Sequence, residues 1–284
     1  NKDLNTWDFS KIRDANSLLY NASSFNGDIS TWDTSNVTNM YNMLRRTAMD
    51  NTNPGINTKQ VTVDGNTYYA WDVSNVTTMQ YMFYQTYDFD SDISNWDTSS
   101  LVNATGTFAY TYKFNSDISS WDMSNVTSIN SMFYDATNFN QNLGSWDISS
   151  ATNMSNMFFS AQAFAQNVGD WDTSSVTTMS GMFFQNDYFG SDLSSWDTSS
   201  VTSMSAMFND ATSFNQDIGN WDVSNVNDMN SMFSGAESFN QDIGNWDVSN
   251  VTDIYGMFYQ AESFNQDIGN WDVSNVTIMS NMFN

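Results

Sequence analysis

The chain has 284 residues, 40% of them hydrophobic, and it is long enough to bury a sizeable core. It carries 32 acidic and 7 basic residues, a net charge of −25, and residues 114–284 contain 20 acids and no base. Such a charge excludes nucleic acids and anionic membranes as favoured partners. The absence of Cys and His excludes disulfides, the common zinc sites and Cys- or His-based catalysis.

The eleven Trp residues set the period of the chain. Each is followed by Asp, and successive Trp are 25 residues apart except between Trp32 and Trp71, where the interval is 39. A fixed period of this length is typical of a solenoid whose coils pack on their neighbours. Residues 1–284 are therefore predicted to form a single solenoid domain of about eleven coils. We number the coils by their Trp, and the repeat positions from Trp as position 1. The Trp residues are at 7, 32, 71, 96, 121, 146, 171, 196, 221, 246 and 271.

In chain order, the first coil departs most from the repeat. Lys11 and Arg13 replace consensus residues, and Leu18-Leu19 stand where later coils have Met-Phe. We interpret this coil as a partial cap, because terminal repeats need a polar outer face.

The long interval that follows predicts an insertion in the second coil, at about residues 50–67. Alternating β-forming residues flank Asp64-Gly65, which is a strong signal for a hairpin. The surrounding segment, residues 45–70, is the one place where a site would not be repeated along the chain. Its candidate residues are Arg45, Arg46, Lys59, Tyr68 and Tyr69.

The regular coils have apolar residues at positions 6, 9, 13 and 16, for example Val226, Met229, Phe233 and Ala236. Steps of three and four residues indicate a short helix. A short strand is expected at positions 22 to 2, stacked in parallel on the same strand of the next coil. The predicted fold is therefore an α/β repeat. It is a right-handed, leucine-rich-repeat-like solenoid with one short parallel strand and one short helix in each 25-residue coil.

The run F-N-x-D-I-x-x-W-D-x-S-x-V-x-x-M-x-x-M-F, which recurs along nearly the whole chain, resembles a known repeat. It is similar to the 25-residue repeat of BspA-like leucine-rich-repeat surface proteins, which is abundant in mycoplasma lipoproteins and other bacterial surface proteins. The resemblance implies an extracellular or cell-surface location and, in some members, adhesion to other cells. It carries no catalytic residues over to this chain.

Two columns of Asp run along the predicted solenoid, at positions 2 and 22. Stacked carboxylates repel one another unless something satisfies them. One interpretation is calcium held between coils, with Asp217, Asp242 and Asp267 as the candidate ligands. The other is an Asx-type turn, in which each carboxylate accepts nearby backbone amides, and the sequence Asp-x-Ser favours it. No other cofactor is indicated.

Position 5 creates sequons for N-glycosylation, which are used only where the host glycosylates Asn. Because these sequons arise from the repeat itself, a structural role for the Asn side chains is the simpler interpretation. The acceptors are Asn36, Asn75, Asn125, Asn250 and Asn275. The Met and Trp columns are predicted to be core, although a row of exposed Trp would be suited to binding sugars.

The chain is predicted to be non-enzymatic, an adhesive or structural scaffold at the cell surface. The first alternative is a subunit that assembles head to tail into a filament, since the last coil is nearly perfect consensus and its apolar residues need a cover. The other explanation for the uncovered last coil is that the chain is part of a longer array that continues beyond residue 284. The second alternative is a protein that binds or processes glycans through Trp and Asp. Expected partners are a further copy of the chain, other surface proteins or glycans.

Overall fold

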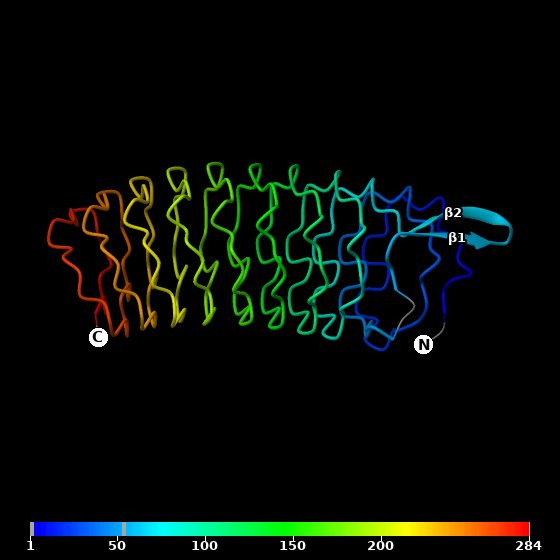
Figure 1. Cartoon of the computed structure of the whole chain (residues 1–284), viewed down its shortest axis with the longest axis horizontal. Coiled ribbons are helices and arrows are strands. Elements are labelled where there is room, and N and C mark those ends of the chain that lie inside the picture. The colour runs from blue at the N-terminus through cyan, green and yellow to red at the C-terminus, as the bar shows by residue number, and fades with distance from the viewer. Residues whose placement is uncertain (1–2, 53–54, 284) are drawn as a thin grey trace.

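The computed structural model describes residues 3–52 and 55–283, which form a rod of stacked coils (Figure 1). The described residues contain no helix, and their only strands are β1 (Lys59–Val63) and β2 (Asn66–Ala70). The prediction of one helix and one strand per coil is therefore wrong, and each coil is a succession of turns. The same residues include no helix of the length and apolarity that a membrane crossing needs.

Tight turns replace the expected helix at positions 9 to 16. In the coil of Trp221, the amide of Met232 donates to the carbonyl of Met229 at 3.2 Å, and that of Ala236 donates to Phe233 at 3.1 Å. Both bonds span three residues rather than the four of an α-helix. Between them, Ser231 and Gly235 have φ of 54° and 69°, and a positive φ ends right-handed helical geometry. The three- and four-residue spacing therefore reflects turns that aim alternate side chains inward.

Hydrogen bonds between coils satisfy the amides that the turns leave free. The amide of Phe233 donates to Met257 in the next coil at 2.9 Å, and that of Asn227 donates to Thr202 in the preceding coil at 3.0 Å. The parallel pairing among the described residues consists of single-residue bridges, at position 8 as in Ser203↔Asp228 and, in the last two coils, also at position 13, Phe258↔Phe283. At positions 22 to 2, where a strand was expected, the amide of Trp221 closes a turn onto Ile218 at 3.1 Å.

The core follows the prediction from the repeat. In the coil of Trp221, the apolar side chains at positions 1, 6, 9, 12, 13, 19 and 23 are at most 4% exposed. Their aromatic rings form ladders along the rod, with Trp196 and Trp221 6.4 Å apart between ring centroids and Phe208 and Phe233 5.8 Å apart. From Trp32 onward, each Trp also donates its indole N–H to a backbone carbonyl that precedes the Trp of the coil before it, as Trp221 does to Leu193, three residues before Trp196, at 3.0 Å. Every coil thus contacts only near neighbours, as in other solenoids.

The insertion leaves the rod at the turn that precedes Trp71. Ile56 takes the place of position 23, because its carbonyl accepts the indole N–H of Trp96 at 2.8 Å. Strands β1 and β2 then pair antiparallel around Asp64-Gly65, whose φ values of 50° and 81° fit a type I′ turn. The hairpin extends outward at the N-terminal end of the rod (Figure 1). It is attached by Tyr68, which packs against the core and donates its hydroxyl to the carbonyl of Thr31.

Candidate binding stripe

The Asp residues at position 2 form Asx turns. In all eleven coils one carboxylate oxygen accepts the backbone N–H two residues later, at 2.9 to 3.2 Å. The Ser hydroxyl and amide at position 4 hold the pKa of Asp122, Asp147 and Asp197 below the ordinary value. These carboxylates are therefore satisfied by the backbone of their own coil.

The candidate calcium ligands have the same geometry. Asp217, Asp242 and Asp267 each accept the N–H of the Gly two residues later, at 3.0, 3.0 and 2.9 Å. No cluster of three or more Asp, Glu, Cys or His side chains suited to a metal ion occurs in residues 3–52 and 55–283. The structure thus gives each carboxylate a backbone partner, and the calcium hypothesis stays a prediction to be tested by chelation.

The sequon Asn side chains connect neighbouring coils. Each donates its Nδ2 to the position 4 carbonyl of the preceding coil at 2.7 to 2.9 Å. Nδ2 is also the atom that would carry a glycan, so a glycan on the folded rod would disturb this contact. The Asn residues bonded in this way are Asn36, Asn75, Asn125, Asn250 and Asn275.

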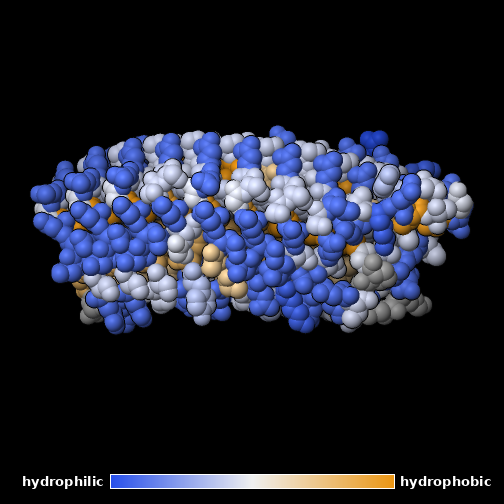
Figure 2. All heavy atoms as spheres, viewed as in Figure 1, coloured by the Kyte–Doolittle hydropathy of each residue, from blue (hydrophilic) through white to orange (hydrophobic). Residues whose placement is uncertain are grey.

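The Trp column lies inside the rod. From Trp32 to Trp271 the indoles are between 0% and 8% exposed, and only Trp7 of the first coil is half exposed. A row of Trp at the surface, which sugar binding through this column would require, is therefore absent from the described coils. Figure 2 shows one long face of the rod, where hydrophilic residues predominate and apolar residues appear in seams between the coils.

The singular residues of the insertion region do not converge on one site. Arg45 lies at position 14 and contacts tyrosines of the adjacent coils, whereas Arg46 donates its Nε to Gln85. Lys59 and Tyr69 are exposed on the hairpin, and Tyr68 anchors it. Arg45, which the sequence singled out, therefore has its aromatic partners in the coils on both sides.

These partners belong to a feature that the repeat consensus did not reveal. Half-buried aromatic rings at positions 14 and 15 contact one another through five consecutive coils, and we call them the aromatic stripe. The distances between successive ring centroids are 5.1, 5.1, 4.3 and 4.2 Å. The members of the aromatic stripe are Tyr84, Tyr110, Tyr134, Phe159 and Phe184.

The aromatic stripe is not required by the construction of the coil. In the next two coils position 14 is occupied by Asn209 and Ser234, yet these coils keep the same buried Phe at position 13. The signal in the sequence was available, as an aromatic residue directly after Phe133, Phe158 and Phe183. It was missed because it is a departure from the consensus rather than part of it.

The rings present two kinds of surface to solvent. Tyr134, Phe159 and Phe184 are nearly parallel, with interplanar angles of 5° and 4°, so they cover one another's faces and expose their edges. Tyr110 is tilted by 40° to Tyr134 and by 67° to Tyr84. Ring faces are therefore more open at this end of the stripe, where burial and neighbouring groups also raise the pKa of the three tyrosines.

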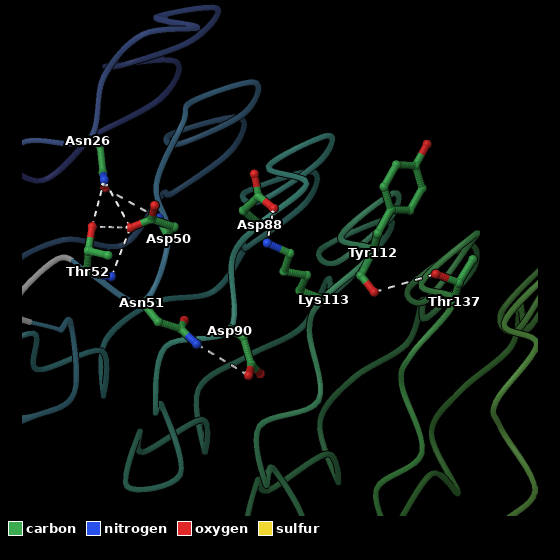
Figure 3. A network of polar contacts seen from close by, with 9 residues as sticks. All are labelled: Asn26, Asp50, Asn51, Thr52, Asp88, Asp90, Tyr112, Lys113 and Thr137. Carbon is green, nitrogen blue, oxygen red and sulfur yellow. Dashed lines mark hydrogen bonds and ion pairs between the residues drawn. The ribbon is translucent and has the colours of Figure 1, made fainter.

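One carboxylate adjoins this open end. Asp135, at position 15, is half-buried, and burial raises its pKa above the ordinary value. Its charge acts on Tyr110, Tyr112 and Tyr134, whose pKa values it helps to raise. The nearest base in sequence, Lys113, forms an ion pair of 2.6 Å with Asp88 in the preceding coil instead (Figure 3).

Comparison with known proteins gives one family. The chain is similar to a family described as mycoplasma protein of unknown function, DUF285, through four overlapping matches at residues 1–63, 56–170, 141–234 and 192–284. Searches of curated proteins and of solved structures give no significant match.

Proposed function

This chain belongs to the mycoplasma family of unknown function DUF285, whose matches span it from end to end, and we propose that it is a non-enzymatic, adhesive scaffold at the cell surface. The aromatic stripe is the surface through which it would bind a macromolecular partner. One observation carries this proposal: half-buried rings occupy position 14 or 15 in five consecutive coils, although coils of the same fold do without them. An exposed apolar patch of this kind is typical of an interaction site.

The rod around the stripe is suited to presenting it. Phe158 and Phe183, directly below the stripe, are fully buried and stack at 5.7 Å. Backbone bonds between coils run beneath the rings, as from Ser160 to Phe184 at 2.7 Å. The rings are therefore held in place before a partner arrives, which lowers the entropy cost of binding. The resemblance to BspA-like surface repeats supports the adhesive part of this proposal.

A protein partner fits the stripe better than a sugar. Sugars stack on the faces of aromatic rings, but Phe159 has its faces covered by Tyr134 and Phe184 at 4.3 and 4.2 Å. Exposed ring edges instead suit apolar side chains, and aromatic pairs readily form edge-to-face contacts. The proposal therefore commits to a polypeptide partner, and glycan binding is an outcome that the experiment below would detect.

The test compares two variants that lose three aromatic rings each. The stripe variant combines Tyr134→Ser, Phe159→Ser and Phe184→Ser. The control variant combines Tyr69→Ser, Tyr188→Ser and Tyr255→Ser, whose rings are 58%, 71% and 44% exposed outside the stripe. Binding of each purified protein to immobilised extracellular matrix proteins, polysaccharides and fixed cells would be measured, with circular dichroism as the check on folding.

We expect the wild type and the control variant to bind at least one protein probe equally, and the stripe variant to bind it at least tenfold more weakly. Binding that survives in the folded stripe variant would overturn the proposal. Binding to polysaccharides alone would replace the polypeptide partner with a glycan.

A further inference from the structure

The chain already places one cation among the tyrosines of this surface. The guanidinium carbon of Arg45 lies 4.2 Å from the ring centroid of Tyr84, 5.4 Å from that of Tyr81 and 5.5 Å from that of Tyr20. The only ion pair among the described residues joins Lys113 and Asp88, so no carboxylate lies within 4 Å of Arg45. The faces of three tyrosines stabilise this guanidinium instead.

The rings around Arg45 are tilted rather than stacked. Tyr81 and Tyr84 are 5.6 Å apart with an interplanar angle of 87°, which leaves a ring face open to the cation. One coil beyond Tyr84 begins a second pair that is not stacked, since Tyr110 and Tyr134 of successive coils are 5.1 Å apart and tilted by 40°. The described residues place no Arg or Lys over this second pair, and the residue after Tyr134 is the half-buried Asp135.

Among the described residues, no basic group forms an ion pair with Asp135. Residues 114–284 contain no Lys or Arg, and Lys113 is engaged by Asp88. Figure 3 shows the side chain of Lys113 directed toward Asp88. Ammonium and guanidinium groups bind to negative charges and to aromatic faces. Here the half-buried carboxylate supplies the charge, and the tilted tyrosines beside it supply the faces.

We propose that Tyr110, Tyr134 and Asp135 form a seat for a lysine or arginine side chain of the polypeptide partner. This inference rests on the proposed function, since the same partner would lay apolar side chains along Phe159 and Phe184. The seat and the apolar rings lie in consecutive coils, so a basic residue followed by apolar residues would contact both. The net charge of −25 favours the approach of such a basic segment.

The experiment uses three synthetic twelve-residue peptides with the full chain. The first contains Arg and Lys among Leu and Phe residues, the second replaces each base with citrulline or acetyl-lysine, and the third replaces each base with Glu. Fluorescence polarisation would measure the dissociation constants at 50 and 500 mM NaCl. The variants are Asp135→Asn and the matched control Asp210→Asn, an Asp at the same repeat position three coils later.

We expect the basic peptide to bind the wild type at least tenfold more tightly than the neutral or acidic peptide. Asp135→Asn should weaken that binding at least fivefold, whereas Asp210→Asn should change it less than twofold. Equal effects of the two substitutions, or no binding of the basic peptide to the wild type, would overturn the cation seat. If binding persists in the stripe variant described above, the proposed function fails as well. If it is lost there but unaffected by Asp135→Asn, only the seat fails.

Discussion

The coils of Trp146 and Trp221 differ at the surface far more than in the core. Phe158 and Phe233 occupy the same fully buried position, and each stacks on the Phe at position 19 of its own coil at 3.9 Å. One residue later, the first coil exposes part of Phe159 and the second has Ser234. The fold constrains position 13 because its side chain fills the core, and it leaves position 14 free. A binding surface is able to vary there without cost to the stack.

The largest expected effect is the difference in stability between substitutions at positions 13 and 14 of the same coil. Phe158→Ala should lower the free energy of unfolding by about 3–5 kcal/mol, through lost burial and the cavity left behind. Phe159→Ala removes a half-buried ring at the surface and should cost only about 0.5–1.5 kcal/mol, the range of an aromatic pair. Urea unfolding of both variants would measure the difference.

Phe233→Ala is the control that removes the ring at position 13 from a coil without the aromatic stripe, the coil of Trp221. It should cost as much as Phe158→Ala, because both rings are 0% exposed. Hydrogen exchange should increase mainly in the substituted coil and its neighbours, since coils contact only adjacent coils. A uniform increase along the rod, or equal costs for Phe158→Ala and Phe159→Ala, would contradict this account.

The sequence predicted the repeat and the core but not the local backbone. The spacing of the Trp residues set the coils, and the apolar positions identified buried residues such as Met229 and Ile243 correctly. The prediction of a helix was wrong because a three- and four-residue spacing of apolar residues also suits successive tight turns. A signal against it existed in Gly106, Gly181 and Gly256, which stand at position 11 with positive φ.

The positive φ of the other turn residues and the aromatic stripe were harder to predict from the sequence. Most residues with positive φ at positions 11 and 15 are Ser, Asn, Asp, Gln or Tyr, and of these only Asn and Asp favour that conformation. Their amides find partners in the next coil, so the conformation depends on contacts 24 residues away, such as that of Ser231 with Tyr255. The aromatic stripe was missed for a different reason, since Phe159 and Phe184 are deviations that a consensus averages out.

Acid should destabilise the rod through the Asx turns at position 2. Hydrogen bonds from Ser lower the pKa of Asp147 and Asp197 below the ordinary value of Asp in the folded state. Their contribution to stability is therefore complete above the unfolded pKa and is lost as the pH falls through the folded one. We expect the melting temperature to decline steeply below about pH 4. Thermal melts between pH 2 and 7 would show a flat profile if these bonds contribute nothing.

Adding rings to the coils that lack them would test whether position 14 is free to vary. Asn209→Phe together with Ser234→Phe places rings beyond Phe184 at the position where Phe159 and Phe184 stack at 4.2 Å. Ser234 lines a surface hollow with Tyr255 and Tyr259, so the new ring has room. We expect the free energy of unfolding to rise by up to about 1 kcal/mol. A loss of stability in urea, absent from the control pair Asn209→Ser and Ser234→Asn, would show that position 14 is not free.

Asp135→Asn should have a smaller effect, opposite in sign to the loss of an Asx carboxylate. Burial raises the pKa of Asp135 above 3.8, so its folded state holds the proton more tightly than its unfolded state. The contribution to stability is present below the unfolded pKa and is lost as the pH rises through the folded one. At pH 7 the substitution should therefore stabilise the rod by roughly a few tenths of a kcal/mol, after allowance for screening by solvent. Melting curves at pH 3 and pH 7 would contradict this if the gain were larger in acid.

Chelation should have the smallest effect, and position 22 provides an internal comparison for it. Coils toward the C-terminus have Asp217, Asp242 and Asp267 there, whereas two earlier coils have Asn142 and Asn167. Asn142 accepts the amide of Gly144 at 3.0 Å, as Asp217 accepts that of Gly219 at 3.0 Å, so a neutral side chain makes the same bond. We therefore expect EDTA to leave the melting temperature unchanged. A bound ion would stabilise only the folded state, and it would act where position 22 is Asp. Hydrogen exchange that rises with EDTA in residues 214–283 but not in residues 139–170 would thus establish a calcium site and overturn the Asx-turn account.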